Sequence, residues 1–220
     1  MRAFILLTLI TPINALSLFH RIRSKLLPFT LPWYESGLQF SCTSCGKCCK
    51  VDGDVWLSPA EVDTIQNHLG VGEEEFKSKY GRAGVSDGQE TWVCLKRKEG
   101  GCIFLNPVGQ CSIYDVRPIQ CETYPFWPSL LASRNDWKNE AVIPDDMELK
   151  ENERYWTAEL GGCEGISYEQ PEDTQSSNDK TQMEDVSIVT RKEIVSKMKA
   201  AKKHWKSFPV EEIKQSTWYL

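Results

Sequence analysis

Four cysteines stand within eight residues in the stretch Cys42-Thr43-Ser44-Cys45-Gly46-Lys47-Cys48-Cys49. Two cysteines three positions apart turn around a tight loop and present both sulfurs to one metal ion, at about 2.3 Å from zinc. Gly46 lets the backbone fold back after the second thiol. The stretch therefore predicts a domain that is organised by metal-bound thiolates.

The first three of these cysteines repeat one spacing, C-x2-C-x2-C. Bacterial ferredoxins use that spacing to hold three corners of an iron–sulfur cluster, and a further thiol comes from farther along the chain. Distant cysteines are present here in four short motifs. These are Cys102-Ile103-Phe104-Leu105, Gly109-Gln110-Cys111-Ser112-Ile113-Tyr114, Arg117-Pro118-Ile119-Gln120-Cys121 and Gly162-Cys163-Glu164-Gly165, with Tyr124-Pro125-Phe126 after the third.

Through these motifs the chain resembles the CxxCxxCC family, also called YkgJ-like, from about Phe40 to Gly165. That family combines an F-x-C-x-x-C-G-x-C-C opening with C-x-F-L, G-x-C-x-I-Y, R-P-x-x-C and Y-P-F elements. The resemblance implies a zinc- or iron-chelating domain, and bacterial members are often called iron–sulfur cluster-binding proteins. The implied metal and cofactor ligands are the eight matching cysteines: Cys42, Cys45, Cys48, Cys49, Cys102, Cys111, Cys121 and Cys163.

Three classes of function are consistent with the cysteines. The first is a protein that holds an iron–sulfur cluster for electron transfer or for structure. The second is a zinc-chelating structural or interaction module with four-thiolate sites. The third is a secreted protein stabilised by disulfides, although nine cysteines leave at least one thiol unpaired. The iron–sulfur protein is the interpretation that the repeated spacing favours.

The adjacent thiols Cys48 and Cys49 are expected to differ in role. Side chains of neighbouring residues point to opposite faces of an extended segment. Eight matching thiols also suffice for two four-thiolate sites, so we expect two metal centres. Cys94 matches none of the family motifs and is expected to be a buried free thiol.

Other catalytic machinery is missing from the sequence. The three histidines are His20, His68 and His204, and they form no zinc-binding cluster in the sequence. There is no G-x-S-x-G, H-E-x-x-H, dinucleotide fingerprint or P-loop. No catalytic residue is therefore assigned, and the sequence leaves open whether the protein is an enzyme.

Charge and hydropathy limit the partners. The net charge of −5 over 220 residues argues against a general nucleic-acid binder. No stretch reaches the roughly 20 apolar residues of a transmembrane helix. We therefore expect one domain with tails, no nucleic-acid partner and no transmembrane segment.

Residues 1–34 have the composition of a targeting leader. They contain four basic residues and no acidic residue, and Ala15-Leu16-Ser17 satisfies the small-x-small rule for signal-peptide cleavage. The basic segment that follows is typical of a transit peptide. The arrangement resembles the bipartite leader of algae with secondary plastids, which implies a plastid location. Thiolate metal sites need reduced thiols, which favours a plastid over the alternatives of secretion or a mitochondrion.

Residues 35–168 are predicted to form a small, irregular α+β domain. Ser58, Pro59 and Glu61 give an N-cap, a first-turn proline and a capping-box acid, and Gly70 offers a stop. Helical periodicity and turn residues place the other elements. The full set is a strand at 51–57, helices at 59–69 and 72–80, a strand around 91–93, a helix or turn at 113–121 interrupted by Pro118, a strand at 137–143 and a helix at 150–160.

The C-terminal part divides into a flexible acidic linker at 169–185 and a helical tail at 186–220. Apolar residues of the tail repeat at helical spacing opposite a lysine-rich face. Core packing is the usual cause of such a stripe, so we expect it to dock on the domain. The alternative is that the basic face meets an unknown acidic protein partner or an anionic membrane surface. The stripe consists of Ile194, Met198, Ala201, Trp205 and Phe208.

Bases and aromatic residues near the thiols have two interpretations. Lys47, Lys50 and Arg117 either offset the negative charge of thiolate-bound metal or are simply solvated, and Arg117 is the strongest of the three. The aromatic residues are expected to pack around the site as core rather than to handle a substrate. They are Phe104, Tyr114, Tyr124, Phe126 and Trp127.

Overall fold

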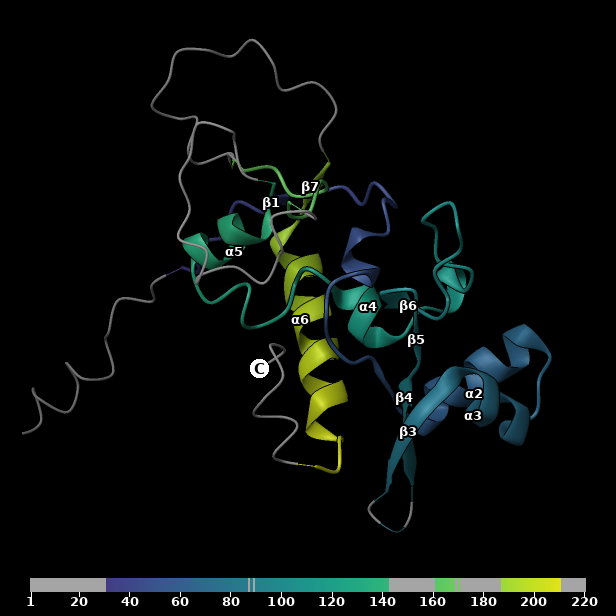
Figure 1. Ribbon diagram of the computed structural model, residues 1–220. Coiled ribbons are helices and arrows are strands. Elements are labelled where there is room, and N and C mark those ends of the chain that lie inside the picture. The colour runs from purple at the N-terminus through teal and green to yellow at the C-terminus, as the bar shows by residue number, and fades with distance from the viewer. Residues whose placement is uncertain are drawn as a thin grey trace, which may run out of the picture. The chain divides into compact units, whose positions relative to one another are not determined.

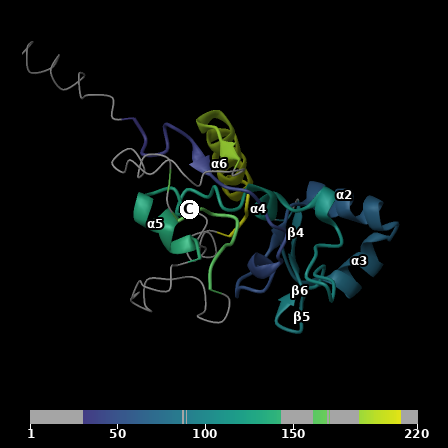
Figure 2. The same ribbon diagram turned by 90° about the horizontal axis from the view of Figure 1, so that it is seen from above.

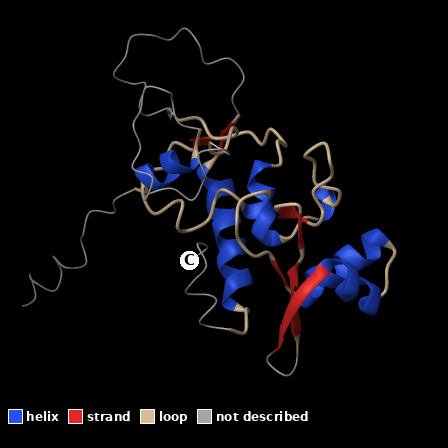
Figure 3. Cartoon of the chain, in the orientation of Figure 1, coloured by secondary structure: helices blue, strands red, loops and turns tan. Residues whose placement is uncertain are grey.

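The computed structural model describes residues 31–86, 88, 90–142, 161–168, 170 and 187–210 (Figure 1). Two units make up the chain, Met1–Pro32 and Trp33–Leu220, and the second contains every helix and strand below. Helices combine with small antiparallel sheets, which confirms the α+β class (Figure 3). Residues 1–30, the helix at 150–160, nearly all of the linker at 169–185, and residues 186 and 211–220 of the tail lie outside the described residues, so those assignments stay predictions.

A three-stranded antiparallel sheet carries one part of the core. Its order is β2 (Trp56–Leu57), β4 (Thr91–Leu95) and β3 (Gly81–Ser86). Trp56 lies opposite Cys94 in the register of β2 and β4. The predicted strand around 91–93 is confirmed, whereas the one at 51–57 is confirmed only at its last two residues.

Two helices pack beside this sheet (Figure 1). Helix α2 (Pro59–Leu69) begins with the predicted capping box, in which the Ser58 amide donates to Glu61 Oε2 at 2.7 Å. It ends at Gly70, whose φ of +66° is the left-handed conformation that glycine adopts freely. Helix α3 (Glu73–Tyr80) follows. Both helices confirm the predictions. Their buried residues join one hydrophobic cluster with residues of the sheet, and α2 contacts β2 and β4 whereas α3 contacts β3.

The cysteine-bearing segments follow the sheet. A hairpin of β5 (Arg97–Lys98) and β6 (Gly101–Cys102) leads to a bridge between Leu105 and Cys111. The 3-10 helix η2 (Tyr114–Val116) and helix α4 (Ile119–Thr123) come next, with Pro118 between them. The sequence predicted that interruption, because proline fixes its own φ and disfavours helix in the preceding residue.

The strand predicted at 137–143 is wrong. Helix α5 (Arg134–Glu140) occupies this region and begins where the Ser133 hydroxyl accepts a hydrogen bond from the Asp136 amide at 3.1 Å. Trp137 and Glu140 lie three residues apart, so they share one side of the helix, and both are buried. Their spacing fits a helix once the serine cap is recognised.

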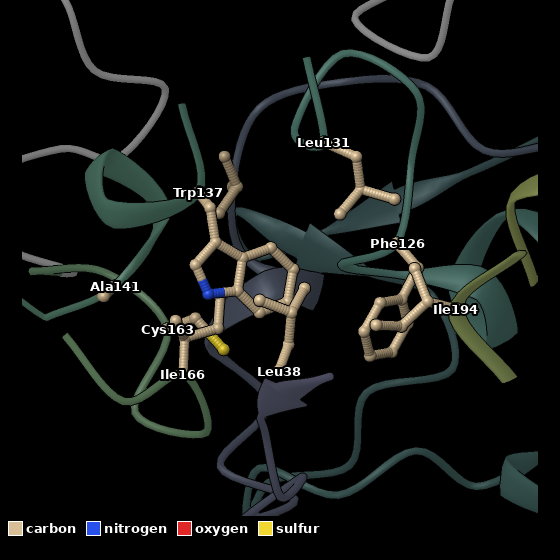
Figure 4. Packing of buried hydrophobic residues seen from close by; sticks show 9 residues of the cluster. Leu38, Phe126, Leu131, Trp137, Ala141, Cys163, Ile166 and Ile194 are labelled. Carbon is tan, nitrogen blue, oxygen red and sulfur yellow. The ribbon is translucent and has the colours of Figure 1, made fainter. Parts of the chain in front are cut away.

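The tail confirms the prediction of a docked helix. Strand β7 (Ile188–Val189) pairs with β1 (Leu38–Gln39), and helix α6 (Arg191–Lys206) then packs against α4 (Figures 1 and 2). Near its start, Ile194 joins the cluster that contains Trp137 and Phe126 (Figure 4), whose ring centres lie 5.6 Å apart. Its other end joins a second cluster, which consists of Trp56, Trp92, Cys94, Trp127, Ala201, Trp205 and Phe208.

The carboxylate of Glu61, on α2, contacts both α4 and α6. One carboxylate oxygen accepts from the Ile119 amide at the start of α4 at 2.7 Å, and the other lies 3.4 Å from His204 Nδ1 on α6. His204 is 5% exposed, and burial lowers the pKa of its imidazole, although Glu61 acts in the opposite direction. The tail is thus joined to the domain by packing and by a buried polar contact.

Truncating Trp205 tests whether α6 is part of the core. The side chain is 1% exposed, so Trp205→Ala is expected to lower the free energy of unfolding by about 3–5 kcal/mol. Lys199→Ala on the exposed face of α6 is the control and should stay within about 0.5 kcal/mol of the parent protein. Urea denaturation measures both, and equal stabilities would contradict the docked helix.

The buried imidazole also predicts a pH dependence. The folded-state pKa of His204 lies below its ordinary value of 6.5, so the unfolded chain binds this proton more tightly than the folded chain. The contribution to stability is complete above pH 6.5 and is lost as pH falls below it. Urea denaturation between pH 7.5 and 5 should show a smaller loss for His204→Gln than for the parent chain. Parallel curves would refute this role for His204.

Candidate metal centre

All eight cysteines that match the family motifs line one cavity of about 190 Å³. They come from five stretches of the chain, around positions 42–49, 102, 111, 121 and 163. A cavity needs only about 10–15 Å³ to hold one water molecule, so this space is large by comparison. The aromatic part of the wall is made by Phe40, Phe104, Tyr114, Tyr124 and Phe126.

The local structure positions the thiols in different ways. Cys48 and Cys49 lie in the 3-10 helix η1 (Lys47–Cys49), Cys102 ends β6, and Cys121 lies in α4. Further backbone bridges join Cys111 to Leu105 and Cys163 to Ala141. The remaining two, Cys42 and Cys45, lie in the loop between β1 and η1. These elements bring together residues that are far apart in sequence.

Gly46 allows two cysteine loops to approach closely. Its φ is +69°, and a Cβ atom at this position would overlap the carbonyl oxygen of Gly109. The loop that carries Cys45 therefore lies directly against the loop that carries Cys111. The role that the sequence suggested for Gly46, a backbone that folds back, is confirmed and extends to a contact between loops.

The expected arrangement of Cys48 and Cys49 is wrong. They lie in a 3-10 helix, where successive side chains are about 120° apart, rather than in an extended segment. Their thiols are hydrogen-bonded to each other, which raises the pKa of Cys48 far above its ordinary value and lowers that of Cys49 to about 7. The nearby guanidinium groups of Arg117 and Arg97 also lower the pKa of Cys49.

Burial raises the pKa of four other thiols that line the cavity. It raises the pKa of Cys102 to about 11 and that of Cys121 well above its ordinary value. Burial is also the main reason that the pKa values of Cys111 and Cys163 are raised. The thiolate is the form that binds metal, so a metal ion must displace protons from these sulfurs.

Cationic side chains surround the thiols. Arg97 donates to the carbonyl oxygens of Lys50 and Val51 at 3.0 Å and so holds the chain just after Cys49. Arg117 lies 3.7 Å from the ring centre of Tyr114 and lines the cavity. Lys197 of α6 lines the cavity too. Sequence reasoning proposed Arg117 but missed Arg97 and Lys197, because long-range packing places both.

Lys47 and Lys50 lie differently from Arg117. The Lys47 ammonium forms an ion pair with Glu164 at 2.6 Å, directly beside Cys163 in sequence. The Lys50 carbonyl oxygen, rather than its ammonium group, makes the contact with Arg97. Lys47 therefore connects the Cys42–Cys49 segment to the segment that carries Cys163. Because both side chains are partly exposed, this ion pair contributes little to the free energy of unfolding.

A buried hydrogen bond supports Cys163. The Tyr124 hydroxyl donates to Glu140 Oε1 at 2.8 Å, and it is also hydrogen-bonded to the Cys163 sulfur. Figure 4 shows Cys163 beside Trp137, Leu38 and Ile166. Aromatic and aliphatic side chains of one cluster thus pack around this thiol, as expected for residues that limit solvent access.

The thiols line one cavity, but their sulfur atoms do not converge on a single point. Among the residues that the structure describes, no three histidine, cysteine, aspartate or glutamate side chains converge closely enough to hold a metal ion. Rotation about the first side-chain torsion moves a cysteine sulfur between staggered positions while the backbone stays in place. The donor set fits a thiophilic metal, and convergence of the sulfurs requires such rotations.

Cys94 lies apart from the cavity, as expected. It is fully buried in β4, and Arg82 Nη2 lies 3.4 Å from its sulfur. All nine cysteines are free thiols, which lends no support to a disulfide framework. Within the described part of the chain, no helix has the length and apolar character needed to cross a bilayer.

Substitution of Gly46 tests the contact between the two cysteine loops. Gly70→Ala is a matched control, because Gly70 has nearly the same φ and open space around it. The control should cost about 1–2 kcal/mol through its backbone conformation alone. Gly46→Ala should cost about 1–3 kcal/mol more through the overlap with Gly109 and should reduce bound metal per chain. Equal stability and equal metal content in the two variants would argue against the contact.

The comparisons with known proteins agree with this geometry. A family model named CxxCxxCC, with the description "Putative zinc- or iron-chelating domain", matches residues 41–160. No solved structure matches the chain. The matched segment spans more than half of the 220 residues and contains seven of the eight cavity cysteines. The chain belongs to the CxxCxxCC family of zinc- or iron-chelating domains.

Proposed function

We propose that this protein holds an iron–sulfur cluster through cysteine thiolates, in an electron-transfer or structural role. The observation that carries the proposal is the gathering of eight thiols from five stretches of chain around one cavity. Thiolate ligands select soft or borderline metals such as iron in clusters, zinc and copper(I). Hard cations such as magnesium prefer oxygen ligands and are poorly suited to this site.

Three features support a cluster over a single ion. The first three cysteines have the C-x2-C-x2-C spacing of bacterial ferredoxins. The cavity of about 190 Å³ is roomy enough for a polynuclear group. Arg97, Arg117 and Lys197 supply positive charge near the thiols, and such charge offsets the negative charge that thiolate ligands give a cluster.

Zinc is the second candidate. Six of the cavity cysteines lie on a helix or strand or at a backbone bridge: Cys48, Cys49, Cys102, Cys111, Cys121 and Cys163. Structural zinc sites are closed, four-coordinate and often built from four thiolates. A zinc-chelating module would bind zinc in the same cavity, and the zinc would serve only to stabilise the fold. Analysis of the bound metal therefore distinguishes it from the iron–sulfur protein.

Anaerobic purification of the full chain tests the proposal. We expect iron and acid-labile sulfide, with visible charge-transfer absorption that bleaches on reduction with dithionite. Removal of the metal should lower the free energy of unfolding, because metal binding is coupled to folding in thiolate sites. Circular dichroism and urea denaturation of the metal-free chain measure this effect.

Two variants sharpen that test. Cys49→Ser should lose bound metal, whereas Cys94→Ser should keep it, since Cys94 lies outside the cavity. A colourless protein that carries zinc would support the second candidate. A chain that stays free of iron, sulfide and zinc after anaerobic reconstitution would contradict both candidates.

A further inference from the structure

Arg117 lies on the cavity wall, and both its side chain and its backbone are held in place. It directly follows the 3-10 helix η2, and residues three apart in such a helix are eclipsed. The guanidinium carbon of Arg117 accordingly lies 3.7 Å from the ring centre of Tyr114. Pro118 disfavours helical backbone in the residue before it, and Arg117 has a φ of −55° and a ψ of 143°. The ring and the proline together fix the place of the guanidinium group.

The hydrogen-bond donors of Arg117 lack acceptors among the residues that the structure describes. Its Nε atom is buried and has no hydrogen-bond partner there. Its terminal nitrogens make no hydrogen bond or ion pair within the described part of the chain either. A buried N–H group without an acceptor costs free energy. The unpartnered donors therefore indicate that Arg117 is built to meet an acceptor from outside the protein fold or one that changes its charge.

Two other cations near the thiols are engaged by the fold. The terminal nitrogens of Arg97 donate to four backbone carbonyl oxygens at 2.6 to 3.4 Å. Lys197 donates to the Glu122 carbonyl oxygen at 3.2 Å and lies 3.9 Å from the carboxylate of the same residue. Arg97 thus stabilises the backbone after Cys49. Of these three cations, Arg117 is the one whose donors are left for a group in the cavity, within the contacts that the structure describes.

Thiolate sulfur is the acceptor that the cavity offers. Eight cysteines line the same cavity as Arg117. A neutral thiol is a weak acceptor, whereas hydrogen bonds to a charged acceptor are shorter and about twice as strong as neutral ones. Metal binding keeps thiols ionised, and four thiolates outweigh the charge of a divalent ion. A thiolate-bound metal centre is therefore an anion that suits an unpartnered guanidinium group.

We propose that Arg117 is a positioning residue of the metal centre and that its guanidinium group donates hydrogen bonds to metal-bound thiolate sulfur. This inference rests on the proposed function, because it requires the cavity thiols to bind metal. It also separates the roles of two arginines. Arg97 stabilises the fold around the thiols, and Arg117 acts on the charge of the sulfurs themselves.

Hydrogen bonds from Arg117 have a predictable effect on the centre. Net charge and hydrogen bonds to the sulfurs are among the factors that set the reduction potential of an iron–sulfur cluster. The reduced cluster carries one more electron than the oxidised cluster, so a guanidinium group stabilises the reduced form more and raises the potential. In a zinc centre the same donors stabilise the thiolates against protonation and so strengthen the binding of metal.

Substitution of Arg117 in the full chain tests the inference. Arg117→Gln should give the reconstituted cluster a more negative potential in a redox titration with dithionite. In the zinc-loaded chain it should raise the dissociation constant for Zn²⁺ about 10–100-fold, measured by competition with the coloured chelator 4-(2-pyridylazo)resorcinol. Arg117→Lys keeps the charge without the planar fork of donors and should lie between Arg117→Gln and the parent. Lys199→Gln removes a positive charge on the exposed face of α6, outside the cavity, and should match the parent.

A pair of substitutions at Tyr114 tests the same inference through the ring that holds the guanidinium group. Tyr114→Phe keeps the ring and should match the parent in potential and in zinc affinity. Tyr114→Ala removes the ring and should reproduce part of the loss seen in Arg117→Gln. Near-ultraviolet circular dichroism checks the fold of each variant, and the Tyr114 pair decides the question if Arg117→Gln does not fold.

The outcomes that would overturn the inference are distinct. An Arg117→Gln chain with the potential and zinc affinity of the parent would refute it with the proposed function intact. Equal effects of Arg117→Gln and Lys199→Gln would show that net charge alone matters, which also refutes the hydrogen bonds. A parent chain that binds neither iron nor zinc would reject the proposed function itself and this inference with it.

Discussion

Eight thiols from five stretches of chain face one cavity, and this crowding of like ligands is the constraint on which the rest of the structure depends. Thiolates repel one another, and burial raises the pKa of Cys102, Cys111, Cys121 and Cys163. The sulfurs cannot all ionise unless positive charge is present among them. A metal ion bound among the sulfurs would supply that charge at short range, and the guanidinium groups of Arg117 and Arg97 lower the pKa of Cys49.

The scaffold explains how a chain with little regular structure maintains this arrangement. Glycine at position 46 permits contact between cysteine loops, and Arg97 fixes the backbone after Cys49 through carbonyl contacts. Helix α6 lies beyond the residues that the family model matches, yet Lys197 on this helix reaches the cavity and Trp205 fills the core. The C-terminal helix is therefore part of the scaffold in this protein.

Local signals predicted much of the fold. The capping box at Ser58 and the glycine at position 70 fixed the ends of α2, and Pro118 separated η2 from α4, because caps and breakers act over a few residues. The same reasoning missed α5, where the cap at Ser133 was not weighed against an apparent strand. Cysteine motifs also identified all eight thiols that line the cavity. Arg97 and Lys197 had no local signal, since tertiary packing alone brings them to the site.

The central claim is that sulfur atoms alone hold the metal in this cavity. X-ray absorption at the metal edge of the anaerobically purified chain measures the ligand atoms and their distances directly. A first shell made only of sulfur, at about 2.3 Å if the metal is zinc, is the result that the account predicts, with an added iron–iron shell if a cluster is present. A first shell of nitrogen or oxygen would contradict it.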